Sequence, residues 1–134
     1  LTIGGQPSGG AGLALRARDL ARLGQIVLQR GDVGSERVVS EAWIDEAFAR
    51  RVPLGSVGDV LRTGGYGYQV WTESVEPEAF VMWGYGGQFV WVVPDESLVV
   101  VAASHWGGIG YPRAGAQADA LGRLIRERVV AALR

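Results

Sequence analysis

Two almost wholly apolar segments, residues 89–93 and 98–103, most restrict what this chain can fold into. Only Pro94-Asp95-Glu96-Ser97 separates them, and these residues suit a tight turn. Valine, phenylalanine and tryptophan favour a pleated surface, so the segments predict two antiparallel strands joined as a hairpin. Because apolar residues occupy both alternating sets of positions, both faces of this strand pair must be covered by other parts of the protein.

A glycine-rich segment, Trp83-Gly84-Tyr85-Gly86-Gly87-Gln88, leads directly into the first of these strands. Glycines at the start of a buried strand allow a ligand or another backbone segment to approach closely. Two interpretations therefore stay open at this point. The segment forms one edge of an active site, or it is a twisted or bulged strand whose glycines serve packing alone.

Composition indicates a folded domain and excludes several kinds of chemistry. The 134 residues are 48% hydrophobic and 20% charged, which is ordinary for a globular protein. A net charge of −1 does not favour a nucleic-acid partner. Every basic residue is arginine, so a lysine base cannot come from this chain, and the absence of cysteine excludes disulfides and thiolate metal sites. We expect no metal site, because the chain has one histidine and no cysteine, and we expect no cofactor. We also expect no membrane span, since no apolar run is long enough to cross a bilayer.

Residue periodicity predicts an α+β fold in which helices flank an antiparallel sheet. The chain should open as a loop as far as Gly12, and a second loop should precede Tyr66. The predicted elements are helices at 17–30 and 40–50, a strand at 66–71, an apolar strand at 79–83, the strand pair 88–93 and 98–103, and a terminal helix at 112–133. The terminal helix should cover one face of the strand pair, and the two earlier helices should cover part of the other.

Particular residues are predicted to mark the ends of these helices and to form their buried faces. Gly31 stands where a C′ glycine belongs, and Ser40 is a good N-cap for the second helix. The buried stripe of the second helix is predicted as Trp43, Ile44, Ala47 and Phe48. That of the terminal helix is predicted as Ala116, Ala120, Leu121, Leu124, Ile125, Val129 and Leu133. In the strand at 66–71, Tyr66, Tyr68 and Val70 should share one face.

A search for a complete catalytic group within the chain fails. A nucleophilic serine needs a base within hydrogen-bonding reach, and no serine here begins an S-x-x-K or sits in a G-x-S-x-G turn. The single histidine, His105, directly follows Ser104, and neighbours on a strand point to opposite faces. Two roles stay open for His105: it lines a cleft at the strand end, or it is an exposed residue at the start of a loop.

Several ordered motifs resemble the C-terminal part of the serine β-lactamase-like superfamily. This superfamily includes class C β-lactamases, D-alanyl-D-alanine carboxypeptidases, and related esterases and amide hydrolases. The motifs are Ser8-Gly9-Gly10-Ala11-Gly12-Leu13, Arg18-Asp19-Leu20-Ala21-Arg22-Leu23-Gly24, Val39-Ser40-Glu41-Ala42-Trp43, Gly65-Tyr66-Gly67-Tyr68-Gln69-Val70-Trp71, and Gly84-Tyr85-Gly86-Gly87-Gln88 continuing through Pro94 to Ser104. The last two look most like the subgroup that includes the 6-aminohexanoate-oligomer hydrolases.

The resemblance implies where this chain would contribute to an active site. In the superfamily, an S-x-x-K supplies the acylating serine, a Y-x-N-type motif supplies a tyrosine, and a strand motif of K-T-G or H-x-G type forms the far wall. Only the third should fall here, on Tyr85-Gly86-Gly87, which makes the backbone N–H of Gln88 the second oxyanion donor. Tyr85 brings no positive charge, so short esters, amides and peptides become better substrates than β-lactams. His105 and Trp83 are further candidates for substrate contact.

These inferences leave three hypotheses. The first is that residues 1–134 are the C-terminal segment of one β-lactamase-like domain, in a serine hydrolase that cleaves an ester or amide through an acyl-enzyme. The nucleophile would then lie in an N-terminal segment outside this chain, and this chain alone would be inactive. The second is a non-catalytic binding or sensor protein that keeps the fold, with which an uncharged Tyr85 is compatible. The third is a stand-alone α+β module whose glycines serve turns only.

Overall fold

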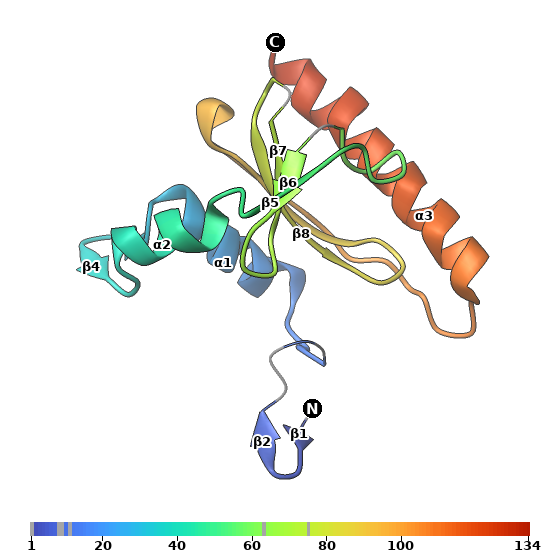
Figure 1. Cartoon of the computed structure of the whole chain (residues 1–134), viewed down its shortest axis with the longest axis horizontal. Helices are drawn as coiled ribbons and strands as arrows, with labels where there is room; N and C mark the ends of the chain where they lie inside the picture. The colour runs from blue at the N-terminus through green and yellow to red at the C-terminus, as the bar shows by residue number, and fades with distance from the viewer. Residues whose placement is uncertain (1, 8–9, 11, 63, 75) are drawn as a thin grey trace.

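A six-stranded antiparallel sheet separates two groups of helices in the computed structural model, which describes residues 2–7, 10, 12–62, 64–74 and 76–134 (Figure 1). The strand order is β10-β9-β8-β7-β6-β5. Its strands are β5 (Val52–Leu54), β6 (Gly64–Tyr66), β7 (Trp71–Glu73), β8 (Ala79–Gly84), β9 (Gln88–Val93) and β10 (Leu98–Ala102). The α-helices are α1 (Ala17–Leu28), α2 (Glu41–Phe48) and α3 (Tyr111–Leu124). The predicted α+β fold is confirmed.

The predicted hairpin forms one edge of the sheet. Residues of β9 and β10 pair from Val93↔Leu98 to Phe89↔Ala102, and a short 3-10 helix, Pro94–Glu96, makes the turn. Ser97 closes this turn with a φ of 49°. From Phe89 to Val93 every residue of β9 is buried, whereas β10, at one end of the strand order, is half-buried throughout. The expectation of burial on both faces therefore holds fully for β9 and only partly for β10.

Helices cover opposite faces of this strand pair, as predicted for the terminal helix and for the helix at 17–30. On one face, Phe89, Trp91 and Val93 join a core cluster with Ala118 and Ile125 of the C-terminal helical segment. On the other face, α1 lies so close to the sheet that a Cβ at Gly24 would come within 2.5 Å of the Val99 Cγ1 atom. The two groups of helices are seen on either side of the strands in Figure 1. None of the helices in the described ranges has both the length and the hydropathy needed to cross a membrane.

The face that the C-terminal helix buries differs from the predicted stripe. The buried positions are Ala114, Ala118, Gly122, Ile125 and Val130, whereas Ala116, Ala120, Leu124 and Leu133 are exposed. The buried positions in α3 are small residues because the helix backbone packs closely against its neighbours. A Cβ at Gly122 would lie 3.1 Å from the Val60 Cα atom. After α3 the chain continues as a π-helical segment, Ile125–Val130, and a 3-10 turn, Ala131–Leu133. The wider π turn rotates the buried face, so Val130 is buried rather than Val129.

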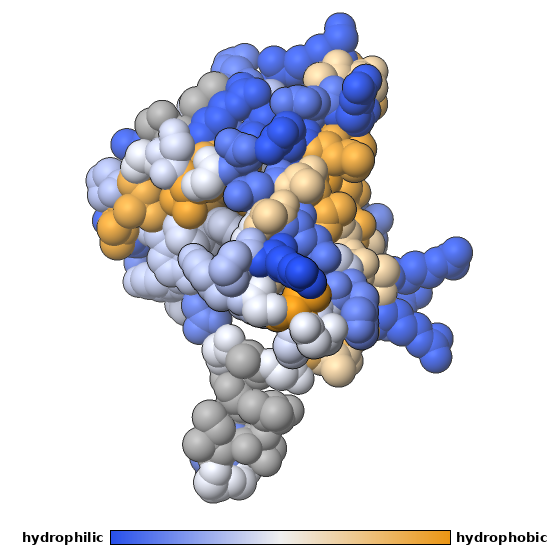
Figure 2. Space-filling view, turned by 90° about the vertical axis from the view of Figure 1, so that its right-hand side faces the viewer, coloured by the Kyte–Doolittle hydropathy of each residue, from blue (hydrophilic) through white to orange (hydrophobic). Residues whose placement is uncertain are grey.

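Hydrophobic side chains consequently remain on the outer side of the C-terminal helix. Leu124 is 53% exposed and Leu133 is 52% exposed. The view from the side of α3 shows hydrophobic residues in orange between the hydrophilic ones in blue (Figure 2). The same misjudgement affects α2, where Ile44 and Ala47 are buried as predicted and Phe48 is half-buried, but Trp43 is 54% exposed. Helical spacing alone does not show which of several apolar positions meets the sheet.

The predicted strand at 66–71 is wrong. Residues 64–66 and 71–73 form two separate strands, β6 and β7, which pair from Tyr66↔Trp71 to Gly64↔Glu73. The chain reverses between them: the Gly67 N–H donates to the Val70 oxygen at 2.8 Å, and Gln69 has a φ of 60°. Tyr68 is therefore exposed at a turn instead of sharing a strand face with Val70. The loop predicted before Tyr66 also contains strand β5.

The opening residues form more structure than the predicted loop. Strands β1 (Thr2–Ile3) and β2 (Gln6–Pro7) pair as a small separate hairpin. Of the first motif that carries the family resemblance, Ser8, Gly9 and Ala11 lie outside the described residues.

Both predicted helix ends have specific hydrogen bonds. Ser40 caps α2 through its hydroxyl oxygen, which accepts the Trp43 N–H at 3.2 Å and confirms the prediction. At the end of α1, the Gly31 N–H donates to the Ile26 oxygen at 2.7 Å and the Arg30 N–H donates to the Val27 oxygen at 3.0 Å. This is a Schellman ending with Arg30 at C′ (φ 54°). Gly31 thus occupies C″, one position beyond the predicted C′. A Cβ at Gly31 would overlap the Val39 carbonyl oxygen.

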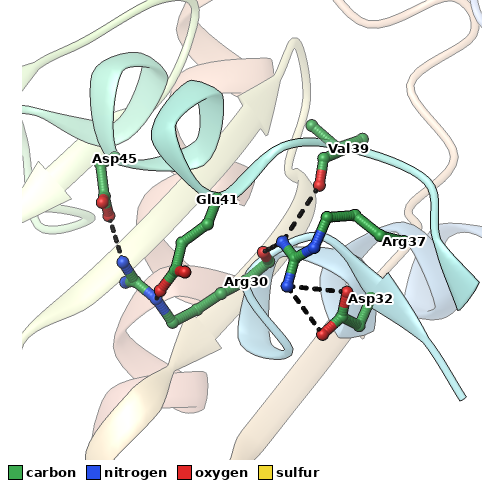
Figure 3. A network of polar contacts seen from close by, with 6 residues as sticks. All are labelled: Arg30, Asp32, Arg37, Val39, Glu41 and Asp45. Carbon is green, nitrogen blue, oxygen red and sulfur yellow. Dashed lines mark hydrogen bonds and ion pairs between the residues drawn. The ribbon is translucent and has the colours of Figure 1, made fainter. Parts of the chain in front are cut away.

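Charged side chains join the end of α1 to α2 (Figure 3). Arg30 donates to the carboxylates of Glu41 at 2.5 Å and Asp45 at 2.6 Å. These two hydrogen bonds raise the pKa of the Arg30 guanidinium, which keeps it charged. Arg37, in the hairpin of β3 (Asp32–Val33) and β4 (Glu36–Arg37), donates to Asp32 and to the Arg30 carbonyl oxygen, both at 3.0 Å. The network thus links the end of α1 to α2 through exposed side chains.

Candidate functional site

The glycine-rich segment is the turn between β8 and β9. The ladder of these strands ends at the pair Gly84↔Gln88, and residues 85–87 form the loop. The Gly87 N–H donates to the Gly84 oxygen at 3.2 Å, which closes a β-turn. Gly86 and Gly87 have φ values of 75° and 91°, a conformation that side chains rarely adopt. We call residues 84–88 the hairpin loop below.

Close packing explains why glycine occupies two of these positions. A Cβ at Gly86 would lie 2.6 Å from the Trp106 Cβ atom. A Cβ at Gly87 would lie 2.8 Å from Leu121 Cδ1 and 3.4 Å from the Ala118 Cα atom. The hairpin loop thus lies against the C-terminal helix and the segment after β10. Both glycines are closely packed, and Gly86 also lines a cavity, so the two interpretations of this segment both stay open.

A cavity of about 430 Å³ lies between the hairpin loop, the end of β8 and α3. The sheet contributes aromatic side chains to its wall, Trp71, Trp83 and Tyr85, together with the backbone of Gly86. The helix α3 contributes the aromatic Tyr111, small residues and one carboxylate, Asp119. Asp119 Oδ1 accepts the Asp59 N–H at 3.2 Å, which fixes the side chain at the rim. Apolar walls with a few polar groups are typical of small-molecule sites.

The end of β8 extends past its neighbour at this cavity. The last pair between β7 and β8 is Trp71↔Val81, and β8 continues to Gly84. The Gly84 carbonyl points into the hairpin loop, because it accepts the Gly87 N–H. In a planar trans peptide the next N–H points the opposite way, so the Tyr85 N–H is directed out of the loop. A backbone donor is thereby presented beside the wall that Trp83 and Tyr85 form.

The family model described as Beta-lactamase matches residues 2–124 of this sequence. The chain belongs to this family. Among curated proteins, the 6-aminohexanoate-dimer hydrolase of Paenarthrobacter ureafaciens is 32% identical over 99 residues, which are 71% of this chain and 25% of that protein. The chain therefore spans about a quarter of the length of this relative.

A solved member of the same fold supports the architecture. The putative 6-aminohexanoate-dimer hydrolase from Bacillus anthracis superposes with a TM-score of 0.50 and 24% sequence identity, over 63% of this chain and 22% of that one. Its likeness bears on the fold alone, which is the antiparallel sheet with flanking helices described above. The resemblance stated from the motifs is confirmed at the level of the family.

Within this member of the β-lactamase family, three of the predicted site residues meet at the cavity. Trp83, Tyr85 and Gly86 line it. Tyr85 is 48% exposed, and its hydroxyl donates a long 3.4 Å hydrogen bond to the Ile109 oxygen. The lining contains neither Gly87 nor Gln88, since Gly87 packs on α3 and the Gln88 side chain points to Ser104.

His105 also lies away from this cavity. It is exposed in the segment that follows β10, and it does not belong to the residues that line the cavity in the described part of the chain. Its predicted contact with substrate stays a prediction. In the ranges that the structure describes, no group of three or more histidine, aspartate or glutamate side chains is arranged to hold a metal ion.

Sequence reasoning missed four residues around the hairpin loop. The Trp71 ring lies tilted against that of Trp83, with ring centroids 5.8 Å apart, and Asp119 supplies the carboxylate of the cavity. Ser104 was weighed only as a nucleophile, and Gln117 was not considered, yet both bond to the loop backbone. The aromatic residue of the Gly65–Trp71 motif was a usable signal for Trp71. The other three depend on contacts between distant segments.

Proposed function

We propose that the protein that contains this chain is a serine hydrolase that cleaves an ester or amide through an acyl-enzyme intermediate. The observation that carries the proposal is the 32% identity to the 6-aminohexanoate-dimer hydrolase of Paenarthrobacter ureafaciens over 71% of this chain. That relative is about four times as long as the matched region, and this chain has no S-x-x-K because it has no lysine. The acylating serine is therefore proposed to come from a part of the protein outside residues 1–134.

In this proposal the hairpin loop forms one wall of the substrate site. The Tyr85 hydroxyl, exposed beside the cavity, would orient a carboxylate of the substrate, and the Trp83 ring would contact its apolar part. Two backbone amides are candidates for the oxyanion donor of this wall. The family motif favours Gln88, and the direction of the Gly84 carbonyl favours Tyr85. One such donor is worth roughly 3–4 kcal/mol in the transition state.

A fluorophosphonate probe tests the proposal directly. We expect the full-length protein to be labelled at one serine, and peptide mapping by mass spectrometry to locate that serine outside residues 1–134. Heat-denatured protein serves as the control for non-specific labelling. A label on a serine of this chain, such as Ser104, would contradict the division of the active site that we propose. Absence of any label, together with binding of an ester or peptide without turnover, would favour the binding or sensor protein.

Tyr85→Phe tests the role of the hydroxyl. This change removes only the hydroxyl, whose one bond within the described residues is the long contact to Ile109. We expect the melting temperature to stay within about 1 °C. For a substrate with a free carboxylate we expect KM to rise about 10-fold to 100-fold, because a hydrogen bond to a charged group is worth about 1.5–3 kcal/mol. An uncharged nitrophenyl ester is the control substrate, and an equal rise in its KM would contradict the assigned role.

A further inference from the structure

The Gly86 carbonyl in the hairpin loop is held by two side chains from different parts of the chain. The Ser104 hydroxyl, just after β10, donates to the Gly86 oxygen at 2.5 Å. The Gln117 amide, on α3, donates to the same oxygen at 2.7 Å. A carbonyl oxygen has two lone pairs, so its acceptor capacity is filled by these two donors. This is the point at which α3 and the segment after β10 both bond to the loop backbone.

The polar groups around this carbonyl are linked to one another by further hydrogen bonds. The second proton of the Gln117 amide goes to the His105 oxygen at 3.1 Å. The Gln88 amide donates its two protons to the Ser104 carbonyl oxygen at 2.7 Å and to the Ser104 hydroxyl oxygen at 3.1 Å. The Ser104 hydroxyl accepts from the Gln88 amide, and its one proton lies within reach of both the Gly86 oxygen and the Gly87 oxygen. Linked hydrogen bonds of this kind restrain the segment that they hold.

The network determines the direction of the peptide groups in the loop. The peptide between Gly86 and Gly87 is held at both ends, by the two donors on its oxygen and by the Gly87 N–H bond to Gly84. The Ser104 hydroxyl also lies 3.2 Å from the Gly87 oxygen, so the peptide that carries the Gln88 N–H is oriented from the same side. Because peptides are planar, holding a carbonyl also sets the direction of the N–H on the same peptide.

We propose that Ser104 and Gln117 are positioning residues for the reaction, which hold the hairpin loop so that the Gln88 N–H is oriented to stabilise the oxyanion. This inference rests on the function proposed above. Neither residue lines the cavity in the described part of the chain, so their effect is exerted through the loop backbone. An oxyanion donor acts only if it is already directed at the place where charge develops. Loss of either side chain should therefore lower kcat more than it alters KM.

The test uses matched pairs of variants in the full-length enzyme. Gln117→Met keeps the length of the side chain and removes both donors, and Gln25→Met makes the same change at an exposed position of α1. Ser104→Ala removes the hydroxyl, and Ser104→Thr keeps it. We expect Gln117→Met and Ser104→Ala to lower kcat on a nitrophenyl ester by about 10-fold to 100-fold, because a misplacement of about 1 Å costs up to 100-fold. KM should stay within about twofold.

The controls separate positioning from a loss of folding. Gln25→Met should keep wild-type kcat, and Ser104→Thr should recover most of the kcat that Ser104→Ala loses. Melting temperatures identify any variant that unfolds. The serine variants and the glutamine variant are two separate tests of the inference. Wild-type kcat in folded Gln117→Met and Ser104→Ala overturns the inference and leaves the proposed function standing. A wild-type protein that neither reacts with fluorophosphonate nor hydrolyses the ester overturns both.

Discussion

Arg126→Met is expected to lower the free energy of unfolding by about 3–5 kcal/mol, because it leaves a buried carboxylate without its charged partner. Arg126 Nη2 lies 3.0 Å from Glu73 Oε1 and 3.2 Å from Oε2. The Glu73 side chain is 4% exposed and that of Arg126 is 13% exposed. Solvent therefore cannot replace the guanidinium after the substitution. Methionine keeps most of the apolar stem, so the effect reports the loss of charge and hydrogen bonds.

The same guanidinium joins several distant segments, which adds to the expected effect. It donates to the Asp59 oxygen at 2.9 Å and to the Val60 oxygen, and it lies over the Trp91 ring with 5.5 Å to the centroid. Val60 is fully buried, so its carbonyl would lose a partner where water does not reach. One side chain thus connects the C-terminal helical segment, strand β7 and the loop before β6.

Urea denaturation of the full-length protein measures the effect, with Arg123→Met as the matched control. Arg123 lies on the same C-terminal helical segment as Arg126 and pairs with Asp59 at 2.5 Å. Its side chain, however, is 53% exposed and that of Asp59 is 61% exposed. Exposed pairs contribute about 0–1 kcal/mol, so we expect a loss in that range. The double variant Arg126→Met/Glu73→Met should recover part of the stability. Equal losses for Arg126→Met and Arg123→Met would contradict the argument from burial.

Gly64→Ala should cost about 3 kcal/mol or more, or prevent folding. Gly64 is a buried residue of β6, and a Cβ there would overlap the Thr72 carbonyl oxygen of β7. The obstacle is backbone rather than a mobile side chain, so the two strands would have to separate. Separation would also break the Tyr66↔Trp71 end of this pair, next to the wall of the cavity.

The control for this variant is Gly55→Ala, and the measurement is soluble yield together with the urea midpoint. Gly55 is exposed, and a Cβ there would meet no heavy atom within 4 Å. Its replacement should leave stability unchanged or raise it by up to about 1 kcal/mol, because alanine restricts the unfolded chain. If Gly64→Ala also kept the wild-type midpoint, β6 and β7 would not be paired as closely as described.

Local signals were sufficient for the elements whose physical cause is local. The two apolar segments and the turn Pro94–Ser97 identified the hairpin of β9 and β10, because strand preference and turn chemistry depend on adjacent residues. Ser40 was identified as a helix cap for the same reason. The motifs were sufficient for the family, which the match over residues 2–124 confirms.

Alternation failed where glycines controlled the backbone. Residues 66–71 alternate like a strand, yet the chain turns at Gly67–Val70, and Gly64 and Gly65 allow a second strand to lie against the first. The pattern of polar and apolar residues would be the same for one continuous strand and for two strands joined by a turn. The close pairing of β6 with β7 distinguishes the two arrangements, and a single sequence does not show which residues pair.

The sequence by itself determines that this protein is an α+β member of the β-lactamase family and that a glycine-rich loop precedes a buried strand. Those properties follow from neighbouring residues and from ordered motifs. Tertiary structure alone decided that Trp71 and Asp119 share a cavity with Tyr85, and that Ser104 and Gln117 hold the Gly86 carbonyl. These contacts join segments far apart in the chain. They exist because burial brings polar groups together where each must find a partner.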